Sequence, residues 1–115
     1  MNYREKLKVR QEEVIAELSS LVEMRRGSIT EQYMESVRKD GSKVRRGPYY
    51  LYTFKEKGKT VSRRIKASEA KTYQEQIDNF RRFKELTSEL RSIGEQLGDL
   101  KIMGEEEVKK TPNMK

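Results

Sequence analysis

The sequence predicts an α+β protein in which an antiparallel pair of long helices carries a three-stranded antiparallel sheet inserted between them. Residues 2–24 and 67–103 have apolar residues at spacings of three and four, as amphipathic helices do. Between them, residues 49–54 are the richest run of β-formers in the chain, and a charged turn and a second alternating segment follow. We expect one domain over residues 1–103, divided into a helix (1–24), a basic sheet (25–66) and a helix (67–103).

The first helix is predicted from an apolar stripe that no Gly or Pro interrupts. The stripe consists of Leu7, Val14, Leu18 and Leu21, widened by Ile15 and Val22. Arg25 and Arg26 suit the negative end of a helix dipole, and Gly27 suits the left-handed residue after a helix. We therefore expect the helix to end near residue 24.

Residues 28–37 alternate in the manner of a first strand. Ile29, Tyr33 and Val37 fall on one side, and the polar residues Thr30, Gln32 and Ser36 fall on the other. A short helix over residues 30–34 is the competing interpretation.

A flexible basic loop is expected over residues 38–47, ending at Gly47 and Pro48. In the aromatic strand that follows, Tyr50, Tyr52 and Phe54 share one face. A hairpin connection over residues 56–59 is predicted to place Gly58 at a positive φ, and a third strand covers residues 60–66.

The second helix is predicted over residues 67–103, with Gly94 and Gly98 able to bend or fray its end. Its stripe contains Tyr73, Ile77, Phe80, Phe83, Leu86, Leu90, Ile93, Leu97 and Leu100. Such a stripe is typical of a coiled-coil seam. We expect its first half to cover the sheet and its second half to pair antiparallel with the first helix. Residues 104–115 are expected to form a disordered tail.

Composition narrows the classes of function. The chain has no cysteine and no histidine, so thiolate metal sites and the commonest general base are absent. No nucleophile–base pair, phosphate-binding loop or metal motif is present, so we expect a protein that is not an enzyme and uses no cofactor or metal. No apolar run is long enough for a membrane span, which predicts a soluble cytoplasmic protein, nucleoid-associated if it binds DNA.

The net charge of +7 is concentrated in the central segment. Residues 25–66 hold 13 Lys and Arg against 4 Asp and Glu, whereas each predicted helix has a net charge of −1. A segment of one sign predicts a polyanionic partner. We expect binding of nucleic acid, with double-stranded DNA favoured over RNA, because a sheet fits the major groove and loop cations can reach the phosphates. The candidate contacts are Arg38, Lys39, Lys43, Arg45, Arg46, Lys55, Lys57, Lys59, Arg63 and Arg64.

Three alternatives remain open from the sequence. The cations could only protect a short sheet against edge-to-edge aggregation, which accounts well for Lys57 and Lys59. The aromatic residues of 49–54 could stack on unpaired bases, although we interpret Tyr50, Tyr52 and Phe54 as core beneath the long helix. Finally, the long stripe could pair with another chain, making the protein a helical interaction module or a homodimer.

The segment from about residue 25 to 95 resembles an uncharacterised family of small prokaryotic proteins with an RGS-[IL]-T…GPY pattern, often found near mobile elements. The residues that carry the resemblance are Arg26-Gly27-Ser28-Ile29-Thr30, Gln32-Tyr33, Gly47-Pro48-Tyr49-Tyr50, Gly58-Lys59 and Ser62-Arg63. Relatives tend to carry cysteines where this chain has Ser36, Ser42 and Val44, so the resemblance implies no metal here.

Residues 41–80 are also similar to the arm-binding domain of tyrosine integrases and to AP2-type domains. Those domains read DNA with the exposed face of a three-stranded sheet. The similarity implies the same use of the sheet only by analogy.

Overall fold

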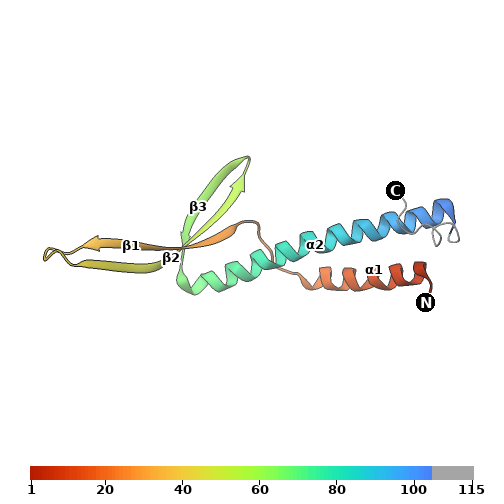
Figure 1. Cartoon of the computed structure of the whole chain (residues 1–115), viewed down its shortest axis with the longest axis horizontal. Helices are drawn as coiled ribbons and strands as arrows, with labels where there is room; N and C mark the ends of the chain where they lie inside the picture. The colour runs from red at the N-terminus through yellow and green to blue at the C-terminus, as the bar shows by residue number, and fades with distance from the viewer. Residues whose placement is uncertain (105–115) are drawn as a thin grey trace. The chain divides into compact units, whose positions relative to one another are not determined.

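In the order of the chain, one helix precedes and one helix follows a three-stranded antiparallel sheet (Figure 1), which confirms the predicted α+β fold. The structure, a computed structural model, describes residues 1–104. The elements are α1 (Tyr3–Ser20), β1 (Ser28–Val37), β2 (Lys43–Glu56), β3 (Lys59–Ile65) and α2 (Ala67–Met103). Apart from Gly104, the tail expected over residues 104–115 lies outside the described residues.

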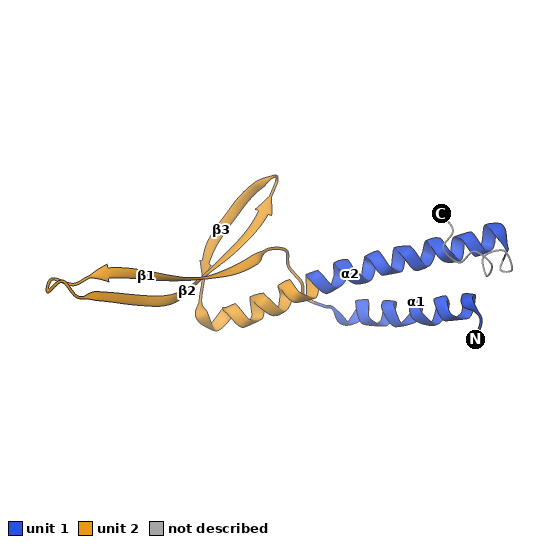
Figure 2. Cartoon of the chain, in the orientation of Figure 1, with its two compact units in different colours: residues 1–22, 81–115 blue, residues 23–80 orange. Residues whose placement is uncertain are grey.

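The chain divides into two compact units, each with its own core (Figure 2). The sheet unit is Glu23–Phe80 and contains the three strands and the beginning of α2. The helical unit combines Met1–Val22 with the part of α2 that begins at Arg81. The single domain expected over residues 1–103 stays a prediction.

The helical unit is an antiparallel helix pair held by apolar residues at heptad spacing, as the sequence predicted. Its buried core consists of Leu7, Val14, Leu86, Ile93 and Leu100. Leu90 and Leu97 of α2 pack against this core, so the second half of the apolar stripe is used within the chain. Heptad spacing on both helices keeps these side chains facing one another along the whole interface.

Polar side chains at heptad spacing run beside this core. Three interhelical pairs in this row are Tyr3 with Gln96, Arg10 with Glu89, and Glu17 with Arg82. Arg10 donates from Nε and Nη2 to the two carboxylate oxygens of Glu89, at 2.5 and 2.8 Å. Hydrogen bonds from the arginines hold the pKa of Glu17 and of Glu89 below the usual value for a glutamate.

Helix α1 ends at Ser20, four residues earlier than expected. The hydroxyls of Ser19 and Ser20 donate to the carbonyls of Ala16 and Glu17, a local pattern that competes with continuation of a helix. The prediction that Gly27 follows the helix end was therefore wrong.

Gly27 instead lies against the sheet, with φ +119°. A Cβ at this position would lie 2.5 Å from the carbonyl oxygen of Thr53 and 2.7 Å from the ring of Tyr52. The glycine thus permits a close approach of the incoming chain to β2. The Tyr52 hydroxyl donates to the carbonyl of Arg26 at the same place.

Strand β1 covers residues 28–37 as predicted, and the competing short helix over residues 30–34 was wrong. In the register of β1 and β2, Ile29 pairs with Tyr52 and Glu31 with Tyr50. On its other side β2 pairs with β3, where Tyr50 lies opposite Ile65. Strand β2 is therefore the centre of the sheet.

Strand β2 begins at Lys43, so most of the loop expected over residues 38–47 is strand. Residues 43–49 pair with the end of β1 and continue beyond β3 as a two-stranded ribbon (Figure 1). A bulge interrupts the ribbon between Gln32 and Met34, where Gly47 and Pro48 of β2, joined by a cis peptide bond, lie opposite the one residue Tyr33.

The connection between β2 and β3 is the predicted tight turn. Lys57 and Gly58 have φ values of +50° and +78°. Helix α2 then begins at Ala67, and Gly94 and Gly98 do not interrupt it.

The core of the sheet unit consists of Tyr52, Ile65 and Ile77. Tyr50 and Phe54 pack against it, as do Ala70 and Tyr73 of α2. The interpretation of the aromatic residues Tyr50, Tyr52 and Phe54 as core is confirmed.

Candidate nucleic-acid interface

The sheet has two chemically different faces. The covered face carries Tyr50, Tyr52 and Phe54 and packs on α2. Side chains alternate along a strand, so the residues between these lie on the other side, which we call the open face. The β1 and β3 residues of the open face are all exposed. It consists of Ser28, Thr30, Gln32, Met34, Ser36, Val44, Arg46, Tyr49, Leu51, Thr53, Lys55, Thr60, Ser62 and Arg64.

The open face contains no carboxylate. All three strand carboxylates, Glu31, Glu35 and Glu56, belong to the opposite side of the sheet in the observed register. The open face combines hydroxyl and amide side chains with three cations, the ring of Tyr49 and the apolar residues Met34, Val44 and Leu51. Thr53 Oγ1 and Ser62 Oγ are hydrogen-bonded across the strands at 2.9 Å.

The predicted contact residues separate into three groups. Arg46, Lys55 and Arg64 lie on the open face. The side of the covered face carries Lys43, Arg45, Lys59 and Arg63. The remaining three are at the hairpin ends: Arg38, Lys39 and Lys57. The predicted set is therefore not one surface, because adjacent arginines point to opposite sides.

None of the 13 cations in residues 25–66 forms an ion pair with a carboxylate among the described residues. In the helical unit, by contrast, Arg10 and Arg82 are both paired. All 13 except Arg25 are exposed. The positive charge of the sheet unit is therefore not neutralised within the part of the chain that the structure describes, and it is available to a polyanion.

Several arginines stack on tyrosine rings. On the open face, the guanidinium carbon of Arg64 lies 4.5 Å from the centre of the Tyr49 ring, and Nη2 lies 4.0 Å from the Met34 sulfur. On the other side, Arg45 lies 4.0 Å from the ring of Tyr33. Such contacts orient a guanidinium without neutralising its charge.

Arg63 and Arg25 serve the covered face. Arg63 Nη2 donates to the Tyr73 hydroxyl at 3.2 Å. Arg25 lies 4.5 Å from the Tyr73 ring and donates to the Gln76 side chain at 2.9 Å. Arg63 therefore connects β3 to α2, and Arg25 connects the segment before β1 to α2, so we assign both arginines a structural role.

Alternation along the strand places Tyr49 on the face opposite Tyr50, as the structure has it. Sequence reasoning missed the contacts of Tyr49 and Met34 with Arg64 on that face. The position of Met34 beside Arg64 depends on the strand register and was not predictable from alternation.

The end of the β1–β2 hairpin is ordered by its own hydrogen bonds. The Arg38 N–H donates to the Ser42 carbonyl at 2.8 Å, and both the hydroxyl and the N–H of Ser42 donate to Asp40. These bonds lower the pKa of the Asp40 carboxyl, with the hydroxyl as the larger cause. The backbone of Arg38 and Lys39 therefore lies in a hydrogen-bonded turn at the end of the ribbon rather than in a long loop.

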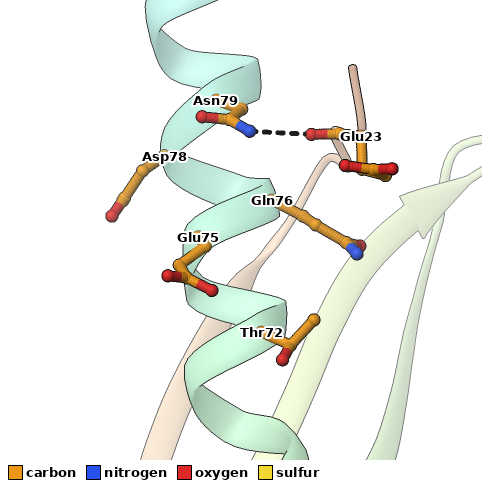
Figure 3. Close-up of a pocket in the computed structure, with 6 residues that line it drawn as sticks. All are labelled: Glu23, Thr72, Glu75, Gln76, Asp78 and Asn79. Carbon is orange, nitrogen blue, oxygen red and sulfur yellow. Dashed lines mark hydrogen bonds between the residues drawn. The ribbon is translucent and has the colours of Figure 1, made fainter. Parts of the chain in front are cut away.

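A second candidate site is a hollow of about 440 Å³ in the sheet unit, lined by Glu23, Thr72, Glu75, Gln76, Asp78 and Asn79 (Figure 3). Asn79 donates to the backbone carbonyl of Glu23 at 2.9 Å, whereas Asp78 points away from Glu23 and Gln76. Within residues 1–104, no three His, Cys, Asp or Glu side chains are grouped to hold a metal ion. The amides of this hollow fasten the chain before β1 to α2, and we assign it no chemistry.

None of the helices within residues 1–104 has the length and apolarity needed to cross a membrane. A family model described as "Domain of unknown function (DUF6788)" matches residues 4–75, which is more than half of the chain. Comparison with curated proteins and with solved structures gave no match.

Proposed function

The chain belongs to this family of unknown function, and we propose that it is a non-enzymatic nucleic-acid-binding protein that contacts double-stranded DNA through the open face of its sheet. Cytoplasmic, nucleoid-associated location is part of this proposal. The association with mobile elements implied by the resemblance stays a prediction.

The observation that carries the proposal is the separation of charge between the two sides of the sheet. Arg46, Lys55 and Arg64 share the open face with no carboxylate, while every strand carboxylate belongs to the other side. Basic side chains also occupy both hairpin ends. A surface with this distribution attracts phosphates over its whole length, and its hydroxyl and amide groups can bond base edges.

The shape favours DNA over double-stranded RNA. The major groove of B-DNA is about 12 Å wide and admits a two-stranded ribbon. Residues 32–37 and 43–49 form such a two-stranded ribbon, and it is exposed on both sides over most of its length. The major groove of A-form RNA is too narrow and deep for such an element.

Binding through stacking on unpaired bases has less support. The rings of Tyr50 and Tyr52 belong to or pack against the core, and one face of Tyr49 is occupied by Arg64. The alternative that the cations only prevent edge-to-edge aggregation accounts for Lys57 and Lys59. It does not account for arginines that project from the face of the sheet.

Adjacent arginines on opposite sides provide a matched test. The double variant R46A/R64A removes two charges from the open face, and R45A/R63A removes two charges of the same type from the other side. We expect wild type to bind a 20-bp duplex with log K falling by about 0.9 per phosphate contact for each unit of log salt concentration. R46A/R64A should weaken binding at least tenfold more than R45A/R63A. Fluorescence anisotropy at 50, 100 and 200 mM salt measures both quantities, with a single strand and a duplex RNA as comparison probes.

Two outcomes count against the proposal. Equal losses in the two double variants would mean that only the overall charge matters and that the open face is not the contact surface. Absence of binding at 50 mM salt would refute DNA binding altogether. Circular dichroism spectra and unfolding curves establish first that both variants are folded.

The alternative, a module that pairs with another chain through α2, ranks second. Leu86, Ile93 and Leu100 are already buried with α1, so the stripe that motivated it is covered within the chain. Sedimentation velocity at high protein concentration tests it, and a monomer there would contradict both this alternative and the homodimer.

A further inference from the structure

Arg64 extends across the open face instead of standing at its edge. Its backbone lies on β3, paired with Leu51 of β2. Its guanidinium lies over Tyr49, two residues along β2, and reaches the sulfur of Met34 on β1. One side chain therefore spans all three strands, and its charge lies near the middle of the open face.

The Arg64 guanidinium has no strong hydrogen-bond acceptor among the described residues. A tyrosine ring supports it at 4.5 Å, and a thioether at 4.0 Å is a weak acceptor. No carboxylate is paired with it, and the residue is exposed. The N–H groups are thus oriented by stacking while remaining available to a ligand, and little side-chain entropy is lost when they bind.

Arginine and lysine are distributed differently over the open face and the β2–β3 end. That end carries three lysines, Lys55, Lys57 and Lys59, whereas the β1–β2 end carries both Arg38 and Lys39. The two cations nearer the middle of the open face are Arg46 and Arg64. Lysine is suited to a phosphate as a point charge, whereas the planar fork of arginine matches the O6 and N7 acceptors of guanine. When a sheet lies in the major groove, its middle faces base edges and its ends face the backbone.

We propose that Arg64, held on the ring of Tyr49, is the residue that reads a guanine base in the major groove. The inference rests on the proposed function and adds the base that is recognised. The hairpin-end lysines then supply affinity without sequence information, and Tyr49 is a positioning residue that acts through Arg64.

The test is a selection from 30-bp duplexes with a random 12-bp centre, carried out with wild type, R64K and R63K. R64K keeps the charge but loses the fork, and R63K makes the same change at the neighbouring residue on the other side of the sheet. We expect wild type and R63K to enrich guanine at a fixed position and R64K to lose that enrichment. Replacing the selected guanine by 7-deazaguanine, which lacks the N7 acceptor, should weaken wild-type binding about 5-fold or more and leave R64K unchanged.

The role of Tyr49 has its own readout. Y49F keeps the ring and should keep the guanine preference, whereas Y49L should lose it while retaining the salt dependence of binding. K57A should weaken binding equally for the selected and unselected duplexes, because a phosphate contact carries no sequence information.

Failure of this inference is distinguishable from failure of the proposed function. If wild type binds duplexes in a salt-dependent way but enriches no guanine, or if R64K enriches it equally, the base-reading role is wrong and DNA binding stands. If no duplex is bound at 50 mM salt, the proposed function is wrong, and the base-reading role of Arg64 is then wrong as well.

Discussion

Replacement of Gly27 by alanine tests the packing of the chain against β2 at the entrance to the sheet. The new Cβ would lie 2.5 Å from the Thr53 carbonyl oxygen, which is backbone and cannot rotate away, and 2.7 Å from the Tyr52 ring. The positive φ of +119° adds strain for any L-residue, of about 1–3 kcal/mol.

Relief of the clash would disturb the core of the sheet unit. Moving the Tyr52 ring endangers its hydrogen bond to the Arg26 carbonyl, worth about 1 kcal/mol. Overpacking of a well-packed site costs a further 1–3 kcal/mol or so. We therefore expect Gly27→Ala to lower the free energy of unfolding by about 3–7 kcal/mol in total.

Gly41 is the matched control, because it also has a positive φ, +88°, but has no atom within 4 Å of the Cβ position. Gly41→Ala should cost only the conformational strain, leaving a difference of about 2–4 kcal/mol between the two variants. Urea unfolding followed by near-UV circular dichroism is suitable, since five of the six tyrosines lie in the sheet unit. Equal destabilisation by the two substitutions would refute the close-approach argument.

Two further predictions concern the helical unit. Leu86→Ala should lower the free energy of unfolding by about 2–5 kcal/mol, because the side chain is fully buried. Ile102→Ala, at a position 83% exposed on the same helix, should change it by less than about 0.5 kcal/mol in chemical denaturation. The folded pKa values of Glu17 and Glu89 lie below their unfolded values, so their stabilisation is complete above the unfolded pKa, about 4.3, and is lost as pH falls through the folded values. The midpoint of thermal unfolding should fall over this acid range, and the double variant E17Q/E89Q should show a smaller fall; an equal fall would contradict the linkage.

The long amphipathic helix α2 was predictable from the spacing of its apolar residues. The same spacing predicted that its first half packs on the sheet and its second half on α1. Strand β1 was also predictable, because Ile29, Tyr33 and Val37 fall on one side of an extended chain and polar residues fall on the other. The end of α1 was not, since the serine hydroxyls that bond back to Ala16 and Glu17 are local competitors that an apolar stripe does not reveal.

The first part of β2 was unpredictable for a different reason. Residues 43–46 contain one apolar residue, Val44, and the other three are exposed cations. The sequence therefore has no alternation of apolar and polar residues that would indicate a strand. The pairing of this segment depends on backbone bonds to β1. The bulge at Gly47 and Pro48 then inverts the alternation within β2, which places Arg46 on the same face as Tyr49. Charge counting found the cations, but only the register could assign each one to a face.

The polar pairs between α1 and α2 also determine which alignment of the two helices is acceptable. Heptad repeats allow one helix to slide by seven residues and still meet apolar partners. A slide in one direction would place Arg10 opposite Arg82, and a slide in the other would place Glu17 opposite Glu89. Because the charge alternates from one heptad to the next, both misaligned hairpins are penalised by like charges, and the observed pairing is the one alignment of the three that satisfies every charged group in the row.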